Sequence, residues 1–314
     1  MAYAMGEGFA QADLQQFEKN YIRVAQQTES KLLKTPAVQH MDIKGISNLA
    51  TIDAVELEEV TDRGSNPDKV YTEMSAKNRK SIQRRFTRTY LFDDYDKCVN
   101  LIKDPTSDLF LNLKEAFKRV TDKCIIDSAI APVYIGKSTE AGVLTTAEDD
   151  GVITIDGKTA FNYETVISPA ITAFNNNYIE AEGVTLAISG VEEQALRDEE
   201  QALRDDEKYM NALYSNANTV GKGKIENASG FHVVKFAGTQ NGVSEIEHPI
   251  LAENDGVRTN LFLAPNAIAF AIELGRLDCV KSATKVNSWE VTIDVWFKGV
   301  RRQGARVIKA LSTM

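Results

Sequence analysis

The strongest hydrophobic pattern in the chain is helical and lies between residues 104 and 131. Apolar residues recur there at steps of three and four, namely Leu109, Leu113, Phe117, Val120 and Cys124. Lysine and arginine residues occupy positions between them, so one face is apolar and the other is charged. Asp104 can cap the first turn, Pro105 suits that turn, and Pro132 ends the pattern. We therefore predict a long amphipathic helix over 104–131, called here the spine helix.

Two segments before the spine helix, 49–60 and 82–92, have the alternation of extended strands. One side of the second strand carries Ile82, Arg84, Phe86, Arg88, Tyr90 and Phe92. Neither side is purely apolar, and the polar linker between the strands is longer than an ordinary hairpin loop. Because a hairpin without an apolar face is not stable alone in water, we predict a protruding arm that another subunit stabilises.

The N-terminal segment has a second amphipathic pattern. From Asp13 to the residues before Pro36, helical phase is kept by Leu14, Phe17, Tyr21, Val24, Thr28 and Leu32. Few apolar partners lie nearby in the sequence, so this arm helix needs the rest of the protomer or a neighbour. We expect Leu14, Phe17 and Tyr21 to make that contact.

The second half of the chain mixes both periodicities. Helices are predicted over 159–180, over the duplicated EEQALRD segment at 192–205, and in the short apolar stretch NAIAFAIELG that follows Pro265. Strands are predicted over 184–188, 231–236 and 260–264. The alternating segment 289–297, a basic turn at 298–304 and a return at 306–311 predict a closing antiparallel hairpin.

Length and charge narrow the functional classes. A chain of 314 residues exceeds the usual single core, so two or more compact units are expected. The net charge of −9 argues against a protein whose whole surface binds nucleic acid. Three widely spaced cysteines favour a reducing compartment. The N-terminal residues predict no secretion signal, and no run of about 18 apolar residues predicts a membrane span.

Candidate catalytic and ligand-binding motifs are weak throughout the sequence. The histidines His40, His232 and His248 lack a second ligand at metal-binding spacing. Cys98 and Cys124 lie in helical patterns without an adjacent base, and the GKGK segment at 221–224 lacks the residues of a phosphate loop. We therefore predict no catalytic residue, no cofactor and no metal site.

Two clusters of basic residues are the remaining distinctive feature. The first consists of Arg79, Lys80, Arg84, Arg85 and Arg88, and the second of Lys298, Arg301, Arg302 and Arg306. Either cluster could contact phosphates without reading bases. Contact with acidic neighbouring subunits is the favoured alternative, because the chain as a whole is acidic.

The order of these elements resembles the major capsid proteins of tailed bacteriophages, which have the HK97-like fold. The segments that carry the resemblance are FEKNYIRVAQQTESKLLKTPAV, RRFTRTYLFDDYDKCVNLIKDPTSDL, GKIENASGFHVVKF and WEVTIDVWFKGVRRQGARVIKAL. The resemblance implies an α+β fold with an N-terminal arm at 1–48 and an extended E-loop hairpin at 49–92. It also implies a P-domain at 93–150 and 285–314, with the spine helix and closing hairpin, and an A-domain at 151–284.

The same resemblance implies a structural function. The expected protein is a shell subunit that forms hexamers and pentamers of an icosahedral phage head around double-stranded DNA, after assembly in the host bacterial cytoplasm. Contact with the DNA would be non-specific, and scaffolding, portal and decoration proteins are candidate further partners. On this view the E-loop contacts a neighbouring subunit through Arg84, Arg85, Phe86, Arg88 and Tyr90.

Two alternatives stay open on the sequence. An encapsulin-type compartment would share the fold and enclose an enzyme cargo in place of DNA. An enzyme whose site lacks a recognisable motif would belong to another class, and it would form small oligomers without a shell.

Overall fold

The computed structural model describes twelve ranges of the chain, which are 29–41, 49–55, 76–93, 106–137, 145–147, 151–157, 161–180, 183–205, 227–228, 231–236, 257–285 and 287–313. The predicted contacts of the arm helix, Leu14, Phe17 and Tyr21, lie outside these ranges, as does the hairpin linker 56–75. The chain divides into two compact units. Unit 1 takes its described core elements from Arg84–Thr121 and Ile272–Phe297, and unit 2 consists of Lys31–Gln83, Asp122–Ala271 and Lys298–Met314.

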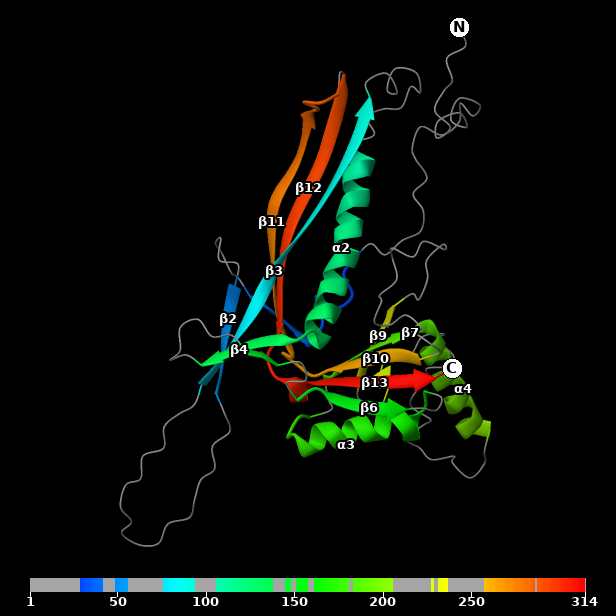
Figure 1. The fold of residues 1–314 in the computed structure, drawn as a ribbon. Coiled ribbons are helices and arrows are strands. Elements are labelled where there is room, and N and C mark those ends of the chain that lie inside the picture. Colours follow the sequence, from blue (N-terminus) through cyan, green and yellow to red (C-terminus); the bar gives the residue numbers. More distant parts are fainter. Residues whose placement is uncertain are drawn as a thin grey trace, which may run out of the picture. The chain divides into compact units, whose positions relative to one another are not determined.

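Unit 1 is built from parts of one helix and three long strands (Figure 1). The elements are α2 (Thr106–Ile130), β3 (Ala76–Asp93), β11 (Ile268–Lys281) and β12 (Ser288–Arg301). The strands have the order β11-β12-β3. One side of β12 is apolar and buried through Val291, Ile293, Val295 and Phe297, and α2 buries Leu113 and Phe117. The predicted spine helix is thus confirmed, and Leu113, Phe117 and Cys124 of its predicted apolar face are buried, while Val120 is half-buried.

Unit 2 contains a six-stranded sheet with the order β6-β13-β10-β7-β9-β8. The strands are β6 (Ile153–Gly157), β13 (Val307–Thr313), β10 (Val257–Leu263), β7 (Thr185–Ser189), β9 (Phe231–Phe236) and β8 (Asn227–Ala228). A π-helical turn (Tyr163–Ile167), α3 (Ser168–Asn176) and α4 (Gly190–Asp205) accompany it. The core centres on Phe231, whose ring meets Phe174 and Phe262 edge-on at centroid distances of 6.5 and 5.2 Å.

The long hairpin is also present. β2 (Leu49–Val55) pairs antiparallel with the first part of β3, from Leu49 opposite Ile82 to Val55 opposite Ala76. The same part of β3 pairs with β4 (Val133–Lys137), which in turn pairs with β5 (Thr145–Ala147). β1 (Val38–His40) pairs parallel with β11. These strands form one seven-stranded sheet with the order β1-β11-β12-β3-β4-β5, in which β2 also pairs with β3. Both predicted strands are therefore present, but the predicted pairing is wrong: the second strand begins earlier, at Ala76, and β2 pairs with residues 76–82, of which only Ile82 belongs to the predicted strand 82–92.

The helix predicted in NAIAFAIELG is wrong, because this stretch is the beginning of β11. Four successive residues, Ile268, Ala269, Phe270 and Ala271, are all buried. A continuous apolar run fits a strand that is covered on both faces as well as it fits a buried helix, so periodicity does not distinguish them. Pairing with β1 and β12 decides for the strand.

The predicted closing hairpin is also wrong, although both of its strands exist. β12 pairs with β11 and β3, whereas β13 pairs with β10 and β6 in the other sheet. Both edges of β12 are already used, so the returning chain cannot pair with it. The change of sheet takes place in a 3-10 turn (Gly304–Arg306), where Arg302 N donates to Ala267 O and Ala264 N donates to Arg306 O, both at 2.9 Å.

Gly299 of β12 allows close packing within unit 2. A methyl group built on Gly299 would lie 2.2 Å from Ser128 Oγ and 2.9 Å from the Phe270 ring. Gly299→Ala is expected to cost about 1–3 kcal/mol of unfolding free energy, because these atoms must move apart. Denaturant titration of the folded protein measures this cost.

The matched control is Gly190→Ala, where the added carbon meets no atom within 4 Å. We expect its stability to stay within about 0.5 kcal/mol of the parent. Adding Ser128→Ala to Gly299→Ala should restore part of the loss. Equal stability of the parent and Gly299→Ala would contradict the packing described here.

Candidate assembly surface on the long strand

The outer part of β3, residues 84–91, places different chemistry on its two sides. Arg84 and Arg88 are exposed and alternate with the half-buried Phe86 and Tyr90. The opposite side carries Arg85, Thr87, Thr89 and Leu91, all of which are exposed. All eight residues belong to unit 1. The candidate E-loop contacts of the sequence analysis therefore lie on both faces of one strand.

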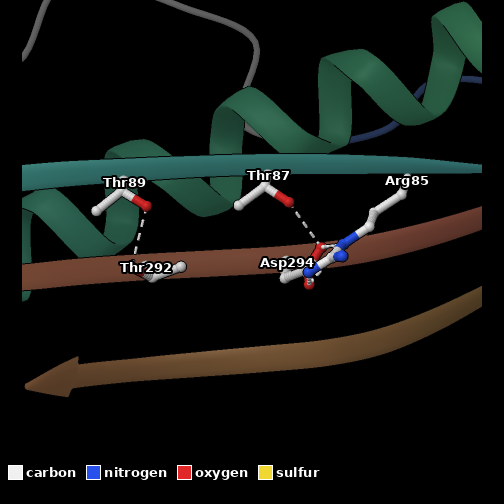
Figure 2. A network of polar contacts seen from close by, with 5 residues as sticks. All are labelled: Arg85, Thr87, Thr89, Thr292 and Asp294. Atoms are coloured by element: carbon white, nitrogen blue, oxygen red, sulfur yellow. Dashed lines mark hydrogen bonds and ion pairs between the residues drawn. The ribbon is translucent and has the colours of Figure 1, made fainter.

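Arg85 is held by an ion pair within its own subunit (Figure 2). Its guanidinium donates to both carboxylate oxygens of Asp294, with Nη2 at 2.5 Å from Oδ2 and Nε at 3.0 Å from Oδ1. Thr87 Oγ1 donates to the same carboxylate at 2.9 Å. Hydrogen bonding to Asp294, and then its negative charge, raises the pKa of Arg85. Asp294 is 4% exposed, so these donors satisfy an acid that lies inside the sheet.

Thr89 and Thr292 extend this polar row along the same two strands. Their hydroxyls are 3.0 Å apart and form a hydrogen bond (Figure 2). In that view α2 lies behind β3 and β12, while the drawn side chains project from the near side. The sheet of unit 1 therefore has an apolar face toward α2 and a polar face away from it.

Phe86 and Tyr90 contact groups of their own subunit. The Phe86 ring meets Phe297 edge-on at a centroid distance of 5.6 Å, and Phe297 is 2% exposed. Arg88 lies over the Tyr90 ring at 5.8 Å. On α2, burial lowers the pKa of Arg119, and Glu115 and then Tyr90 partly oppose that effect. The apolar side of β3 thus forms part of the core of unit 1, which leaves Arg84 and Arg88 as its exposed basic residues.

The second basic cluster is largely internal, which removes most of its predicted capacity to contact phosphates. Lys298 is 1% exposed and Arg301 is completely buried. Arg301 Nη1 donates to Ala129 O at 2.6 Å and to Ala131 O at 3.3 Å, so it satisfies carbonyls at the end of α2. Arg306 donates to Pro265 O at 2.7 Å, and Arg302 donates to the Gln39 side chain. Hydrogen bonds from these arginines therefore stabilise the segment that leads from β12 in one sheet to β13 in the other.

A buried carboxylate anchors the segment that begins at Lys31. Asp122 of α2 is completely buried and accepts the backbone N–H of Lys31 at 3.0 Å and that of Leu32 at 3.1 Å. The Lys31 ammonium donates to Lys235 O at 2.5 Å and lies over the Phe236 ring. Burial lowers the pKa of Lys31, although the charge of Asp122 opposes this shift. The chain is therefore fixed to unit 2 from Lys31 onward.

The sequence analysis missed both buried acids. Asp294 had a visible signal, since it is the one aspartate of an alternating apolar strand, WEVTIDVWF. Asp122 had no such signal, because it lies beside charged residues on a long helix, where an aspartate is expected to be exposed to solvent. Sequence periodicity reports the face of an element, whereas these roles depend on donors about 90 and 209 residues away.

Within the described ranges, no group of three metal-ligating side chains could hold an ion. None of the described helices is long and apolar enough to cross a membrane. Cys124 is buried and Cys279 is half-buried, and neither forms a disulfide within the described residues.

The sequence matches the model of one protein family. A family model described as phage capsid protein matches residues 10–313. No curated protein matches the sequence significantly.

Solved structures with a similar fold come from phage heads. The head structure of Helicobacter pylori bacteriophage KHP40 aligns with a TM-score of 0.67 at 10% identity, covering 95% of each chain. The capsid of cyanophage P-SCSP1u aligns with a TM-score of 0.65 at 11% identity, and the alignment covers 98% of this chain and 95% of that chain. The capsid of Ralstonia phage GP4 aligns with a TM-score of 0.61 at 13% identity, and the alignment covers 100% of this chain and 98% of that chain. The likeness covers the whole chain at the level of the fold.

Removing either partner of the Arg85–Asp294 pair should have unequal effects. Arg85→Ala leaves a buried carboxylate with fewer donors, whereas Asp294→Ala leaves a side chain, Arg85, that is 64% exposed and can be hydrated. We expect Asp294→Ala to cost about 1–3 kcal/mol of unfolding free energy and Arg85→Ala to lower the denaturation midpoint further. Thr89→Val, which removes one exposed hydroxyl pair, is the control and should change the midpoint least. The reverse order of the two charge variants would show that Asp294 is hydrated.

Asp122→Ala should release the segment that starts at Lys31. The two backbone N–H groups lose a buried charged acceptor, so we expect a loss of about 3 kcal/mol. Amide hydrogen exchange at Lys31 and Leu32 should become faster than at Val38, which is held by pairing with β11. Asp122→Asn keeps one acceptor oxygen and should be intermediate. Unchanged exchange at Leu32 in Asp122→Ala would contradict the anchor.

Proposed function

This chain belongs to the phage capsid protein family, and we propose that it is the major capsid protein whose copies close the icosahedral shell of a phage head. The observation that carries this is the family match over residues 10–313, together with a fold shared with phage capsids over nearly the whole chain. The α+β fold is the HK97-like one, and the protein is a structural shell subunit. Phage capsids, and no enzyme-filled compartments, are the source of the matches described above, so the encapsulin alternative has no support over this one.

The copies are proposed to form hexamers and pentamers, and the shell to enclose double-stranded DNA. Capsid proteins assemble as homo-oligomers, and closed shells require repeated interfaces between identical subunits. The virion capsid is then the location of the mature protein, and the host bacterial cytoplasm the place of assembly. Scaffolding, portal and decoration proteins are the further partners that such a head would use.

We assign the regions of the fold as the resemblance implies. The N-terminal arm is 1–48, the E-loop hairpin is 49–92, and the A-domain is 151–284. The P-domain combines 93–150 with 285–314. Support comes from the pairing of β2 with β3, and from the long helix α2, whose bounds, Thr106–Ile130, lie inside the P-domain range.

The contact between subunits is assigned first to Arg84 and Arg88. Both are exposed basic side chains, and the chain carries a net charge of −9, so acidic surfaces of a neighbouring copy are available to them. The other three residues act mainly by holding the strand in place. Arg85 pairs with Asp294, Phe86 packs on Phe297, and Tyr90 lies under Arg88. Leu14, Phe17 and Tyr21 of the arm are proposed to pack on a neighbour as well. Any contact of the shell with DNA is proposed to be non-specific.

Expression of the protein, followed by gel filtration and negative-stain electron microscopy, tests the proposed function. We expect rings or closed shells of the parent protein. A stable species of one to four subunits that never assembles would contradict it.

Reversal of charge tests the role of the exposed arginines. Arg84→Glu combined with Arg88→Glu should give folded capsomers or monomers and no closed shells, because the exposed strand would then repel acidic neighbours. Arg84→Lys with Arg88→Lys keeps the charge and should assemble. Normal particles from the double glutamate variant, seen by electron microscopy, would contradict the assignment of these residues.

A further inference from the structure

The part of α2 that belongs to unit 1 has a positive surface. Residues 111–121 contain three cations and one acid, Glu115, so their net charge is +2. The cations are Lys114, Lys118 and Arg119. Lys114 and Lys118 are exposed, whereas Glu115 is only 8% exposed and its charge acts on Arg119. The exposed charges of this stretch are therefore two lysines one helical turn apart.

Two arginines of β3 lie on the same side of unit 1 as α2. Phe86 packs on Phe297, which belongs to the apolar side of β12, and that side faces α2 (Figure 2). Arg84 and Arg88 alternate with Phe86, so they share its side of the sheet. This side of unit 1, called here the α2 side, thus carries exposed cations from a helix and from a strand.

The described acids of the strands lie mainly on the other face of the sheet. Alternation along β12 places Glu290 and Asp294 there, and alternation along β11 adds Asp278. Arg85 neutralises Asp294 on that face. One acid of β11, Glu273, lies on the α2 side and is half-buried. Among the described side chains, the two faces of unit 1 therefore differ in the sign of their charge.

The lysines of the α2 side fit a polyanion better than they fit a protein surface. Lysine is depleted at the centres of protein interfaces, where arginine is enriched. Its ammonium is a strongly hydrated point charge on a flexible stem, which suits contact with phosphates without reading of bases. Double-stranded DNA carries one negative charge per about 1.7 Å of its axis. On a chain of net charge −9, this positive side is therefore the one that duplex DNA of any sequence would attract.

We propose that Lys114 and Lys118 contact the phosphate backbone of the double-stranded DNA inside the shell, and that the α2 side of unit 1 faces the lumen. This inference rests on the proposed function, and it adds which side of the subunit meets the DNA. Arg84 and Arg88 remain the contacts with a neighbouring copy, because arginine is the cation that protein interfaces favour. The binding is independent of DNA sequence, since contacts with phosphates carry no base information.

The salt dependence of DNA binding gives the first test. Dissociated subunits, shown to be folded by circular dichroism, are titrated into a fluorescent DNA duplex of mixed sequence at several salt concentrations, and anisotropy gives the binding constant. Lys114→Gln with Lys118→Gln should reduce the slope of log K against log salt by about 1.8, since each phosphate contact contributes about 0.9. Lys34→Gln with Lys285→Gln removes the same charge at exposed lysines outside α2 and should leave the slope unchanged. An unchanged slope in the first variant, or an equal reduction in both, would overturn the proposal.

A second measurement separates DNA from protein as the occupant, and it uses the parent chain. Lysines are acetylated in dissociated subunits, in empty shells and in DNA-filled heads, and mass spectrometry gives the rate at each position. We expect Lys114 and Lys118 to react severalfold more slowly in filled heads than in empty shells, while Lys34 and Lys285 react equally in both. Protection that is already complete in empty shells would assign the α2 side to a neighbouring copy and overturn the proposal. Equal rates in empty and filled particles, or equal slowing at all four lysines, would also overturn it.

The two proposals fail in different ways. If the parent chain never forms shells, the proposed function fails. If the parent forms shells that hold DNA while Lys114 and Lys118 contribute nothing to DNA binding, the function stands and only the further inference fails.

Discussion

A three-stranded sheet that is covered by one helix has a second face, and unit 1 is built on this arrangement. The strands β11, β12 and β3 bury Val291, Ile293, Val295 and Phe297 on one side. In the described part of the chain, threonines and Leu91 remain exposed on the other side. A small sheet with one buried face obtains less hydrophobic stabilisation than a core between two covered faces, so the contact with α2 supplies the hydrophobic stabilisation of this sheet.

Buried charges give the long elements their fixed geometry. Asp294 joins two neighbouring strands through Arg85 and Thr87, Asp122 holds the chain at Lys31, and Arg301 satisfies the carbonyls at the end of α2. Each is a buried polar group with partners far away in the sequence, so breaking one leaves a donor or acceptor without compensation. Such groups specify a single arrangement, whereas apolar contacts alone tolerate sliding of one element along another. This suits a subunit that must present the same surfaces in every copy.

The sequence allowed prediction of elements with a clear period and of the fold class, but not of partners. The spine helix was predictable because its apolar residues recur every three to four positions over 25 residues. β11 was predicted as a helix because Ile268 to Ala271 are all buried, which erases alternation. The strands at 289–297 and 306–311 were predicted, yet they join different sheets, since local pattern does not state which edges are taken. Arg84 and Arg85 were equivalent in the sequence, and only the position of Asp294 separates them.

The same reasoning separates the two basic clusters. Arg301 and Lys298 are buried, and Arg301 donates to a backbone carbonyl inside the protein. This part of the second basic cluster therefore stabilises the fold, and it gives no reason to infer a phosphate ligand. Arg84 and Arg88 are exposed on a strand whose neighbouring face is fixed by Arg85 and Thr87. A strand held in this way keeps its exposed charges at a constant spacing, which flexible lysines on a loop would not do. On an acidic chain, exposed cations at a regular spacing suit contact with an anionic surface at short range, where screening by salt is weakest.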